Sequence, residues 1–354
     1  MRVFLSDRNV ALALCPDADW QPDRVTGFSP DANGALVAVS GGQCEGVSIP
    51  CEASLKEPFA SYFNGLSGEV KSLSGAFGPV FAAVSDCPEP AEFTVHARAV
   101  EACVARDTAQ ILDAPTGFNT PVNRAGLLMR ARSFVRAEKS DERVPASVRR
   151  GFRRGAVQQE SRALPYARYF DVEDVHLRHP RFDGGMSPVI DRTVLRAADA
   201  VTVLPYDPVR DQVVVVEQFR PAAYVRGDCH PWVLEPVAGR CDGDEPVEEV
   251  ARREMIEEAG LTLLALEKIA NYYPSPGCLS EYLFTFLGLV DLSDAQSGVH
   301  GVASEDEDIQ THILSFDEAM ALVASGEADN GPLLLSLYWL GANRERLRRE
   351  ASAA

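Results

Sequence analysis

Short apolar runs separated by turn-rich stretches form the pattern of the first 138 residues. The stretches contain Gly, Pro, Asp and Asn, and the apolar runs cover residues 3–5, 35–39, 80–84 and 93–97. Runs this short between turn residues are typical of strands. Two longer segments, 99–112 and 123–137, are predicted to be helices. The pattern therefore indicates a small β-rich α+β domain over residues 1–138.

A polar and basic segment over residues 139–162 follows this domain. Its arginines are Arg143, Arg149, Arg150, Arg153, Arg154 and Arg162. A cationic excess of this kind could contact an acidic partner or a nucleotide, yet charge runs are more often solvated faces. We therefore interpret the segment as a solvated linker or a surface helix.

Strands and helices occur in a mixed order over residues 163–354. Strands are predicted at residues 169–177, 190–195, 200–204, 212–218, 232–237, 266–271, 282–290 and 309–314. One helix is predicted between Pro246 and Gly260, and two more at residues 316–324 and 332–350. This order favours a mixed sheet between layers of helices, an α/β/α sandwich. The fold class expected for the whole chain is α+β.

Composition and charge narrow the functional classes. The 354 residues are enough for two domains. A formal net charge of −18 argues against a general nucleic-acid binder, because no excess of cations is present to neutralise phosphates. The eight cysteines form no CxxC pair and the six histidines no HExxH, so a zinc site is not expected.

The first residues, MRVFLSDRNVALALC, lack the basic start and the long apolar core of a signal peptide. No apolar run in the sequence approaches the 18 or so residues that a membrane crossing requires. We therefore expect a cytoplasmic protein with reduced thiols and no membrane partner.

The segment 239–261, GRCDGDEPVEEVARREMIEEAGL, carries the strongest functional signal. Asp244 is a candidate N-cap, Pro246 suits the first turn of a helix, and Gly260 suits its end. Val247, Val250, Ala251 and Met255 give this helix an apolar stripe at helical spacing.

Three glutamates of this helix, Glu254, Glu257 and Glu258, stand at positions i, i+3 and i+4 and therefore share one face. Their like charges repel unless a cation lies among them, and carboxylate oxygens suit Mg²⁺ or Mn²⁺. Arg253 lies beside them and could orient a carboxylate. A solvated acidic helix face is the alternative, but it does not require Gly239 and Gly260 at these distances.

The segment 239–261 matches the Nudix box, the signature of hydrolases that cleave a nucleoside diphosphate linked to another group. Outside the box, the chain resembles bacterial ADP-ribose pyrophosphatases at 204–211, 217–220 and the acidic loop 301–309. The likeness runs from about residue 169 to residue 339. Pro276, fifteen residues beyond Leu261, matches the proline that marks ADP-ribose as the substrate in this family.

The resemblance implies a metal site and a homodimer. Glu254, Glu258, Glu307 and the backbone carbonyl of Ala238 would hold Mg²⁺, with Mn²⁺ as a substitute. In this family the N-terminal strands swap between subunits and supply adenine contacts. The positions that match those contacts here are Tyr169 and Arg192, each from the partner chain. Thr193 stands where the family often has an acid, which is a departure from the pattern.

The same resemblance assigns roles in catalysis and substrate binding. Glu305 would be the general base, and Glu257 and Arg253 complete the catalytic set. Arg220 would hold a phosphate, and Glu281 would contact the substrate in the pocket. The expected reaction is hydrolysis of ADP-ribose to AMP and ribose 5-phosphate.

Two other functions stay open at this point. The chemistry could act on another nucleotide sugar, since pocket side chains decide the substrate. A non-hydrolysing ADP-ribose sensor is the alternative from a different class, and the loss of a box glutamate would favour it. All of the box glutamates are present.

The first 138 residues resemble γ-glutamylcyclotransferase-like domains, which precede the hydrolase in some tellurite-resistance-associated Nudix proteins. The resemblance rests on the segments 2–5, 35–40 and 46–48. Where that family has a substrate loop with a Tyr-Gly pair, this chain has Ser6-Asp7-Arg8-Asn9. We therefore expect an inactive structural or regulatory domain.

Overall fold

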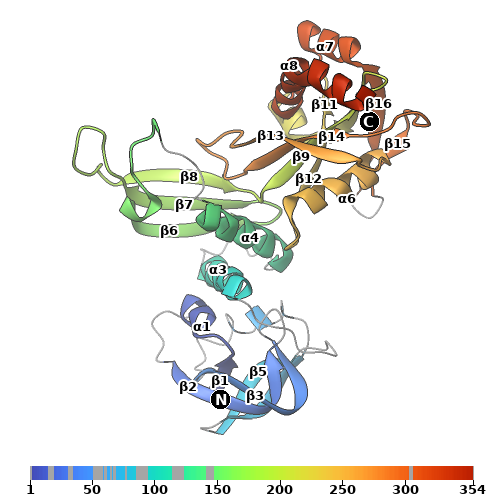
Figure 1. Cartoon of the computed structure of the whole chain (residues 1–354). Helices are drawn as coiled ribbons and strands as arrows, with labels where there is room; N and C mark the ends of the chain where they lie inside the picture. The colour runs from blue at the N-terminus through green and yellow to red at the C-terminus, as the bar shows by residue number, and fades with distance from the viewer. Residues whose placement is uncertain are drawn as a thin grey trace. The chain divides into compact units, whose positions relative to one another are not determined.

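Two units make up the chain, residues 1–197 and residues 198–354. The computed structural model (Figure 1) describes residues 2–14, 20–30, 35–50, 59, 62–63, 66, 69–75, 78–84, 95–113, 123–140, 147–302 and 306–353. The division after Ala197 differs from the boundary at 163 that the sequence suggested for the hydrolase domain. Each unit is built around its own hydrophobic clusters.

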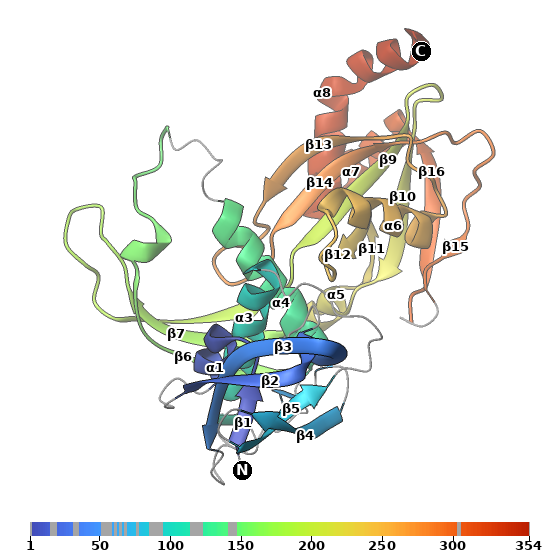
Figure 2. The same ribbon diagram turned by 60° about the horizontal axis from the view of Figure 1, so that its bottom comes forward.

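Five strands of the first unit close into a small barrel in the order β1-β3-β2-β4-β5 (Figure 2). The strands are β1 (Arg2–Leu5), β2 (Gln21–Pro30), β3 (Leu36–Pro50), β4 (Glu69–Gly75) and β5 (Gly78–Val84). Helix α1 (Arg8–Leu14) follows β1, and Asp7 Oδ1 accepts hydrogen bonds from the backbone N–H groups of Asn9 and Val10. The segment Ser6–Asn9 therefore starts a helix. The barrel agrees with the β-rich domain expected here.

Two longer helices follow the barrel, α3 (Val95–Asp113) and α4 (Arg124–Ser140), close to the predicted helices. The apolar run at 93–97 was wrongly interpreted as a strand from Val95 onward; residues 93 and 94 lie outside the described part. The helix includes these positions because α3 has a long apolar face, which packs beside α1 in one cluster with Val100 and Val104.

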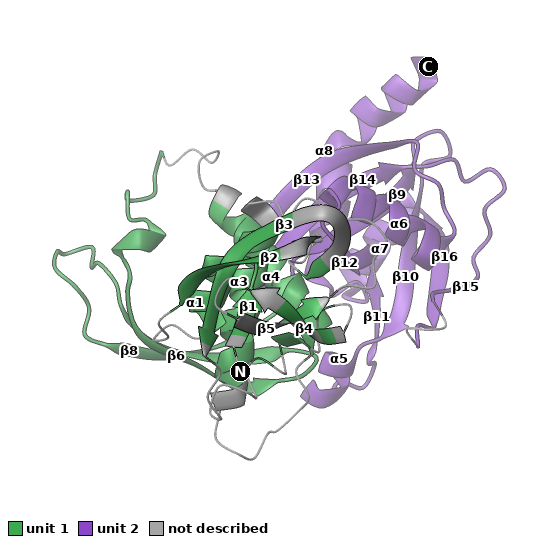
Figure 3. Cartoon of the chain, turned by 90° about the horizontal axis from the view of Figure 1, so that it is seen from below, with its two compact units in different colours: residues 1–197 green, residues 198–354 purple. Residues whose placement is uncertain are grey.

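Three antiparallel strands complete the first unit, β6 (Gln158–Ala167), β7 (Asp171–Arg178) and β8 (Ile190–Arg196) (green in Figure 3). A single 3-10 turn, η3 (Arg154–Ala156), precedes β6. The basic segment was expected to be a linker as far as residue 162, but its last residues, from Gln158, belong to β6. The reason is that Arg162 has buried partners, and only 9% of its side chain is exposed.

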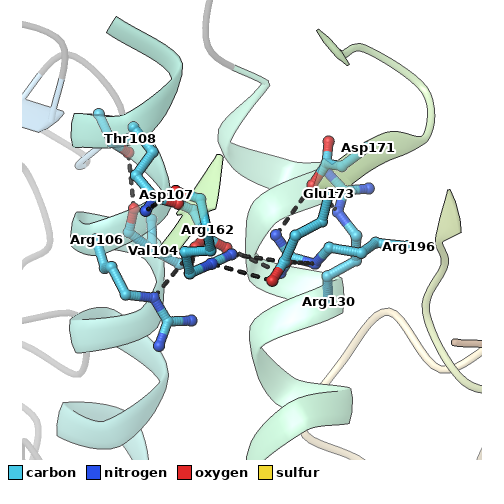
Figure 4. A network of polar contacts seen from close by, with 10 residues as sticks. Val104, Arg106, Asp107, Thr108, Arg130, Arg162, Asp171, Glu173 and Arg196 are labelled. Atoms are coloured by element: carbon cyan, nitrogen blue, oxygen red, sulfur yellow. Dashed lines mark hydrogen bonds and ion pairs between the residues drawn. The ribbon is translucent and has the colours of Figure 1, made fainter. Parts of the chain in front are cut away.

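Buried ion pairs join this sheet to α3 and α4 (Figure 4). Asp107 on α3 accepts hydrogen bonds from Arg162 of β6 at 3.0 Å and Arg196 of β8 at 2.8 Å. Asp171 of β7 pairs with Arg130 of α4 at 2.5 Å, and neither aspartate is exposed to solvent. Burial by itself would raise the pKa of Asp107, but the Arg196 and Arg162 guanidinium groups outweigh it and hold that pKa below its ordinary value.

The second unit contains an eight-stranded mixed sheet in the order β13-β14-β9-β10-β16-β15, with β11 paired to β10 and β12 paired to β9. Only β9 and β14 pair in parallel among these strands of the described chain. The strands are β9 (Ala200–Asp207), β10 (Gln212–Phe219), β11 (Trp232–Glu235), β12 (Val237–Arg240), β13 (Ala265–Tyr272), β14 (Leu283–Leu289), β15 (Val299–His300) and β16 (Ile309–Ser315).

Helices cover both faces of this sheet (Figure 1). They are α6 (Val247–Ala259) on one face and α7 (Phe316–Ser325) and α8 (Gly331–Ala353) on the other, while the short α5 (Pro221–Arg226) follows β10. Alternate residues of β9 separate the two layers. Val201 and Val203 pack with α6, whereas Leu204 and Tyr206 pack with α7 and α8. The expected α/β/α sandwich is confirmed.

None of the helices in the described part of the chain combines the length and the apolar composition that a membrane crossing needs.

Candidate active site

The helix of the box, α6, begins one residue after a proline and ends at a glycine. Its N-cap is Pro246, at φ −58° and ψ 146°, so the prediction of Asp244 as the N-cap was wrong. At the other end, Gly260 has a φ of 64°, and the N–H of Leu261 donates to the carbonyl of Met255 at 3.0 Å. This is the left-handed glycine stop that the sequence predicted.

A close approach of helix to strand places Glu254. A Cβ added to Gly239 of β12 would lie 1.9 Å from the Cδ of Glu254, so any side chain at position 239 would have to displace the end of the Glu254 side chain. The glycine therefore lets the carboxylate lie directly against the strand. The spacing of the box included this glycine, but its physical reason lies in the packing of α6 on β12.

Glu258 is the most deeply buried carboxylate of the box, with 2% of its surface exposed. Its Oε2 accepts a hydrogen bond of 2.9 Å from the N–H of Ala238. Burial raises the pKa of Glu258 to about 8; the Ala238 N–H opposes this, and the charges of Glu254 and Glu307 add to it. Burial likewise raises the pKa of Glu254 to about 7. A cation bound between the two carboxylates would stabilise their charged forms.

Arg253 connects the carboxylates of the helix. Its Nη1 donates to Glu254 Oε1 at 2.7 Å and to Glu257 Oε2 at 3.1 Å. Its Nη2 contacts Asp242 and Glu245 at 3.4 Å. One guanidinium group thus holds two glutamates of the active face and ties them to the loop before the helix.

The acidic loop is attached to the same helix. The N–H of Gly301 donates to the carbonyl of Glu257 at 3.2 Å, and Glu307 Oε2 accepts from the N–H of Val302 at 3.0 Å. The charge of Glu307 contributes to the raised pKa of Glu258, as expected of a group in the same cluster. Glu305 lies outside the described residues, and its role as general base stays a prediction.

The chemistry of these donors fits a divalent cation. In the part of the chain that the structure describes, no three His, Cys, Asp or Glu side chains are already arranged as a set of metal ligands. Glu254 and Glu258 are nevertheless buried carboxylates, and their pKa values are raised by burial and by the charges of neighbouring carboxylates. Carboxylate and carbonyl oxygens are the ligands that Mg²⁺ and Mn²⁺ prefer.

Two predicted substrate residues, Arg220 and Glu281, belong to the same electrostatic environment. Burial raises the pKa of Glu281, while the positive charge of Arg220 lowers it, as it also lowers that of Glu258. Arg220 Nε donates to Glu235 Oε2 at 2.5 Å, and the amide of Asn330 donates to Glu235 Oε1 at 2.9 Å.

Sequence reasoning missed both Glu235 and Asn330. The one available signal was an acidic residue within the predicted strand 232–237, and nothing pointed to Asn330.

The predicted adenine-contacting residues, Tyr169 and Arg192, lie in the first unit. Tyr169 is 60% exposed and packs edge-on against Phe170, with ring centroids 4.8 Å apart. Arg192 is an exposed residue of β8. Because these residues belong to a different unit from the box, their place at the site stays a prediction. Thr193, the departure from the family pattern, donates to Asp174 at 2.6 Å.

Comparisons with known proteins show which family this chain resembles in sequence. The family model of the NUDIX domain matches residues 196–337. An ADP-ribose pyrophosphatase of Escherichia coli K12 is 40% identical over 199 residues, which are 56% of this chain and 94% of the relative. An ADP-ribose pyrophosphatase of Haemophilus influenzae is 37% identical over 186 residues, 52% and 85% of the two chains. A GDP-mannose pyrophosphatase of Escherichia coli O1:K1 is 33% identical over 172 residues, 49% and 88% of the two chains.

The match with the Escherichia coli K12 relative also extends beyond the second unit. That unit has 157 residues, from 198 to 354, and the match covers 56% of the whole chain. Part of the first unit is therefore shared with this relative as well.

Proposed function

Because this chain belongs to the Nudix hydrolase family, we propose that it hydrolyses the pyrophosphate bond of ADP-ribose to AMP and ribose 5-phosphate with Mg²⁺. The protein is an enzyme that cleaves nucleotide pyrophosphates. The observation that carries the proposal is the pair of buried carboxylates, Glu254 and Glu258, held against β12 with raised pKa values. A non-hydrolysing sensor would have no need for this cluster.

The residues that would hold Mg²⁺ are Glu254, Glu258, Glu307 and the carbonyl of Ala238. When bound, the cation supplies positive charge that neutralises the pyrophosphate and favours attack by water. The Ala238 N–H fixes one oxygen of Glu258 and thereby directs the other. Arg253 likewise donates to one oxygen of Glu254 and directs the other.

Proton transfer and phosphate binding fall to other residues. Glu305 accepts the proton of the attacking water as general base. Glu257 and Arg253 keep the catalytic set in place through their ion pair. Arg220 binds a phosphate, and Glu281 contacts the substrate. Tyr169 and Arg192 of a second subunit contact the adenine, which requires a homodimer.

Two observations favour ADP-ribose over other nucleotide sugars. The relatives at 37–40% identity are named ADP-ribose pyrophosphatases, and those at 33–34% are named GDP-mannose pyrophosphatases. Pro276 stands at the distance from the box that marks ADP-ribose in the family. GDP-mannose is the second candidate.

The proposal also covers the domains and the location of the enzyme. The hydrolase domain begins near residue 163, and the γ-glutamylcyclotransferase-like domain before it is inactive. The enzyme acts in the cytoplasm.

A coupled phosphatase assay tests the proposal. It compares phosphate release from ADP-ribose, GDP-mannose and other nucleotide sugars, with Mg²⁺ and with EDTA. We expect Mg²⁺-dependent turnover with the highest kcat/KM for ADP-ribose. A higher kcat/KM for GDP-mannose would replace the substrate and keep the mechanism, whereas binding of ADP-ribose without turnover would favour the sensor.

A further inference from the structure

A chain of three polar side chains connects helix α8 with the phosphate-binding arginine of the proposed function. Arg220 directly follows β10, Glu235 ends β11, and Asn330 directly precedes α8. Arg220 Nε donates to one oxygen of Glu235 at 2.5 Å, and Asn330 Nδ2 donates to the other at 2.9 Å. Glu235 is only 9% exposed, and each of its carboxylate oxygens accepts a hydrogen bond from a protein donor.

This arrangement occupies one edge of the Arg220 guanidinium group and leaves the other free. Among the described residues, only Nε has a hydrogen-bond partner, and both Nη groups have none. Two parallel N–H donors form the fork that binds phosphate oxygens in a bidentate way. The backbone supports the same placement, since the N–H of Arg220 donates to the carbonyl of Pro231 at 2.8 Å.

We propose that Glu235 and Asn330 are positioning residues, which hold Arg220 through Nε so that its two Nη groups bind a phosphate of the substrate. This inference rests on the proposed function for the identity of the phosphate. It gives a reason for burying an acid beside an anion-binding site. A buried ion pair is weak evidence of stabilisation, because desolvation offsets much of the attraction.

The direction in which one substitution changes the affinity for phosphate distinguishes a positioning role from a simple charge effect. If Glu235 were only a negative charge near the phosphate, Glu235→Gln would remove a repulsion and tighten anion binding. If Glu235 holds Arg220, the same change releases the guanidinium group and weakens binding. Asn330→Ser removes the amide that reaches Glu235 but keeps a hydroxyl that can cap α8, where Asn330 Oδ1 now accepts from Leu333.

The experiment is a double-mutant cycle read by calorimetry, with inorganic pyrophosphate and Mg²⁺ as the probe. The variants are Arg220→Ala, Glu235→Gln and the double variant. We expect about a tenfold weaker Kd for each single variant, in the range of a lost charge-assisted hydrogen bond. The double variant should match Arg220→Ala within about twofold, because Glu235 acts through Arg220. Parallel measurements of kcat and KM on ADP-ribose should show the loss mainly in KM.

Glu267→Gln is the matched control, since it breaks another ion pair of the same unit, with Arg346 at 2.7 Å, and should leave Kd unchanged. If Glu235→Gln does not fold, Asn330→Ser takes its place in the cycle. Tighter binding, additive losses or no pyrophosphate binding by the wild type would each overturn the positioning role. Wild-type protein that binds pyrophosphate and leaves ADP-ribose intact would overturn the proposed function alone, and the cycle would still decide this inference.

Discussion

Gly239 and Glu254 lie in such close contact that a methyl group on the strand at position 239 would displace the carboxylate that the helix presents there. A Cβ at position 239 would be 1.9 Å from Glu254 Cδ and 2.0 Å from its Oε1. The glycine is thus part of the geometry of the proposed metal site although it contributes no side chain.

Gly239→Ala should therefore displace Glu254 while α6 remains folded. We expect kcat/KM with Mg²⁺ to fall about 10- to 100-fold, the usual effect of disturbing a residue that supports a metal ligand. Steady-state kinetics at several Mg²⁺ concentrations measures this. Gly243→Ala is the control, because its Cβ would meet Glu245 only at ordinary contact distances of 3.7 Å. Equal losses for both variants would contradict the role of the contact.

Glu258→Gln should abolish turnover without harming the fold. The pKa of about 8 means that this carboxyl is mostly protonated at pH 7 in the metal-free protein, so a neutral amide replaces it with little loss of stability. Tm without metal should stay close to that of the wild type, and the increase of Tm with Mg²⁺ should be much smaller. Unchanged turnover would remove Glu258 from the metal site.

Mg²⁺ binding should release protons. The pKa values of about 7 for Glu254 and about 8 for Glu258 are both raised above the ordinary value, and a metal ligand has to be deprotonated. The affinity for Mg²⁺ should therefore rise with pH up to about 8 and then level off.

The same shifts affect the metal-free protein, because its folded state retains protons that the unfolded chain loses. Its stability should fall as pH rises from the ordinary glutamate range to about 8. For Mg²⁺ binding, calorimetric titrations in two buffers of different ionisation enthalpy count the protons that are released. No proton release at pH 7 would contradict the raised pKa values.

Glu305→Gln should lower kcat far more than it raises KM, because a general base acts on the transition state and not on substrate binding. Asp306→Asn removes the neighbouring charge at a backbone φ of 56°, a conformation that asparagine tolerates. This variant should change kcat and KM very little. Substrate kinetics of both variants checks this. A loss confined to KM would reassign Glu305 to substrate binding.

Asp107→Ala should strongly destabilise the first unit, because the buried Arg162 and Arg196 both lose their pair with Asp107 and keep only Glu173 as a shared partner. We expect a loss of about 3–5 kcal/mol in the free energy of unfolding, the usual effect of breaking a buried ion pair. Urea unfolding measures it, and Asp183→Asn, which breaks an exposed pair with Arg181, should change nothing measurable.

The effect of Asp107 should also depend on pH. Its pKa is lowered in the folded protein, so its stabilising contribution is complete above the ordinary pKa of aspartate and is lost as pH falls through the folded pKa. The difference in stability between wild type and Asp107→Ala should shrink in acid. A difference that stays constant below pH 4 would contradict the lowered pKa.

Local pattern was sufficient for much of the architecture. Most strands and helices of the second unit were predicted, because alternating burial and helical periodicity are visible within a few residues. Asp244 was wrongly predicted as the N-cap because Pro246, two residues later, occupies that position. The run 93–97 was misassigned because the elements that pack on α3 are distant in the sequence.

By itself, the sequence determined the family, the box helix and the shared face of Glu254, Glu257 and Glu258. Helix geometry makes residues three and four positions apart neighbours, so this part of the site is local. Only the tertiary structure decided that Gly239 lies against Glu254 and that Arg220, Glu235 and Asn330 form one chain of contacts. Glu235 and Asn330 are 95 positions apart. Such contacts depend on how the sheet and α8 pack, and no short-range pattern encodes that packing.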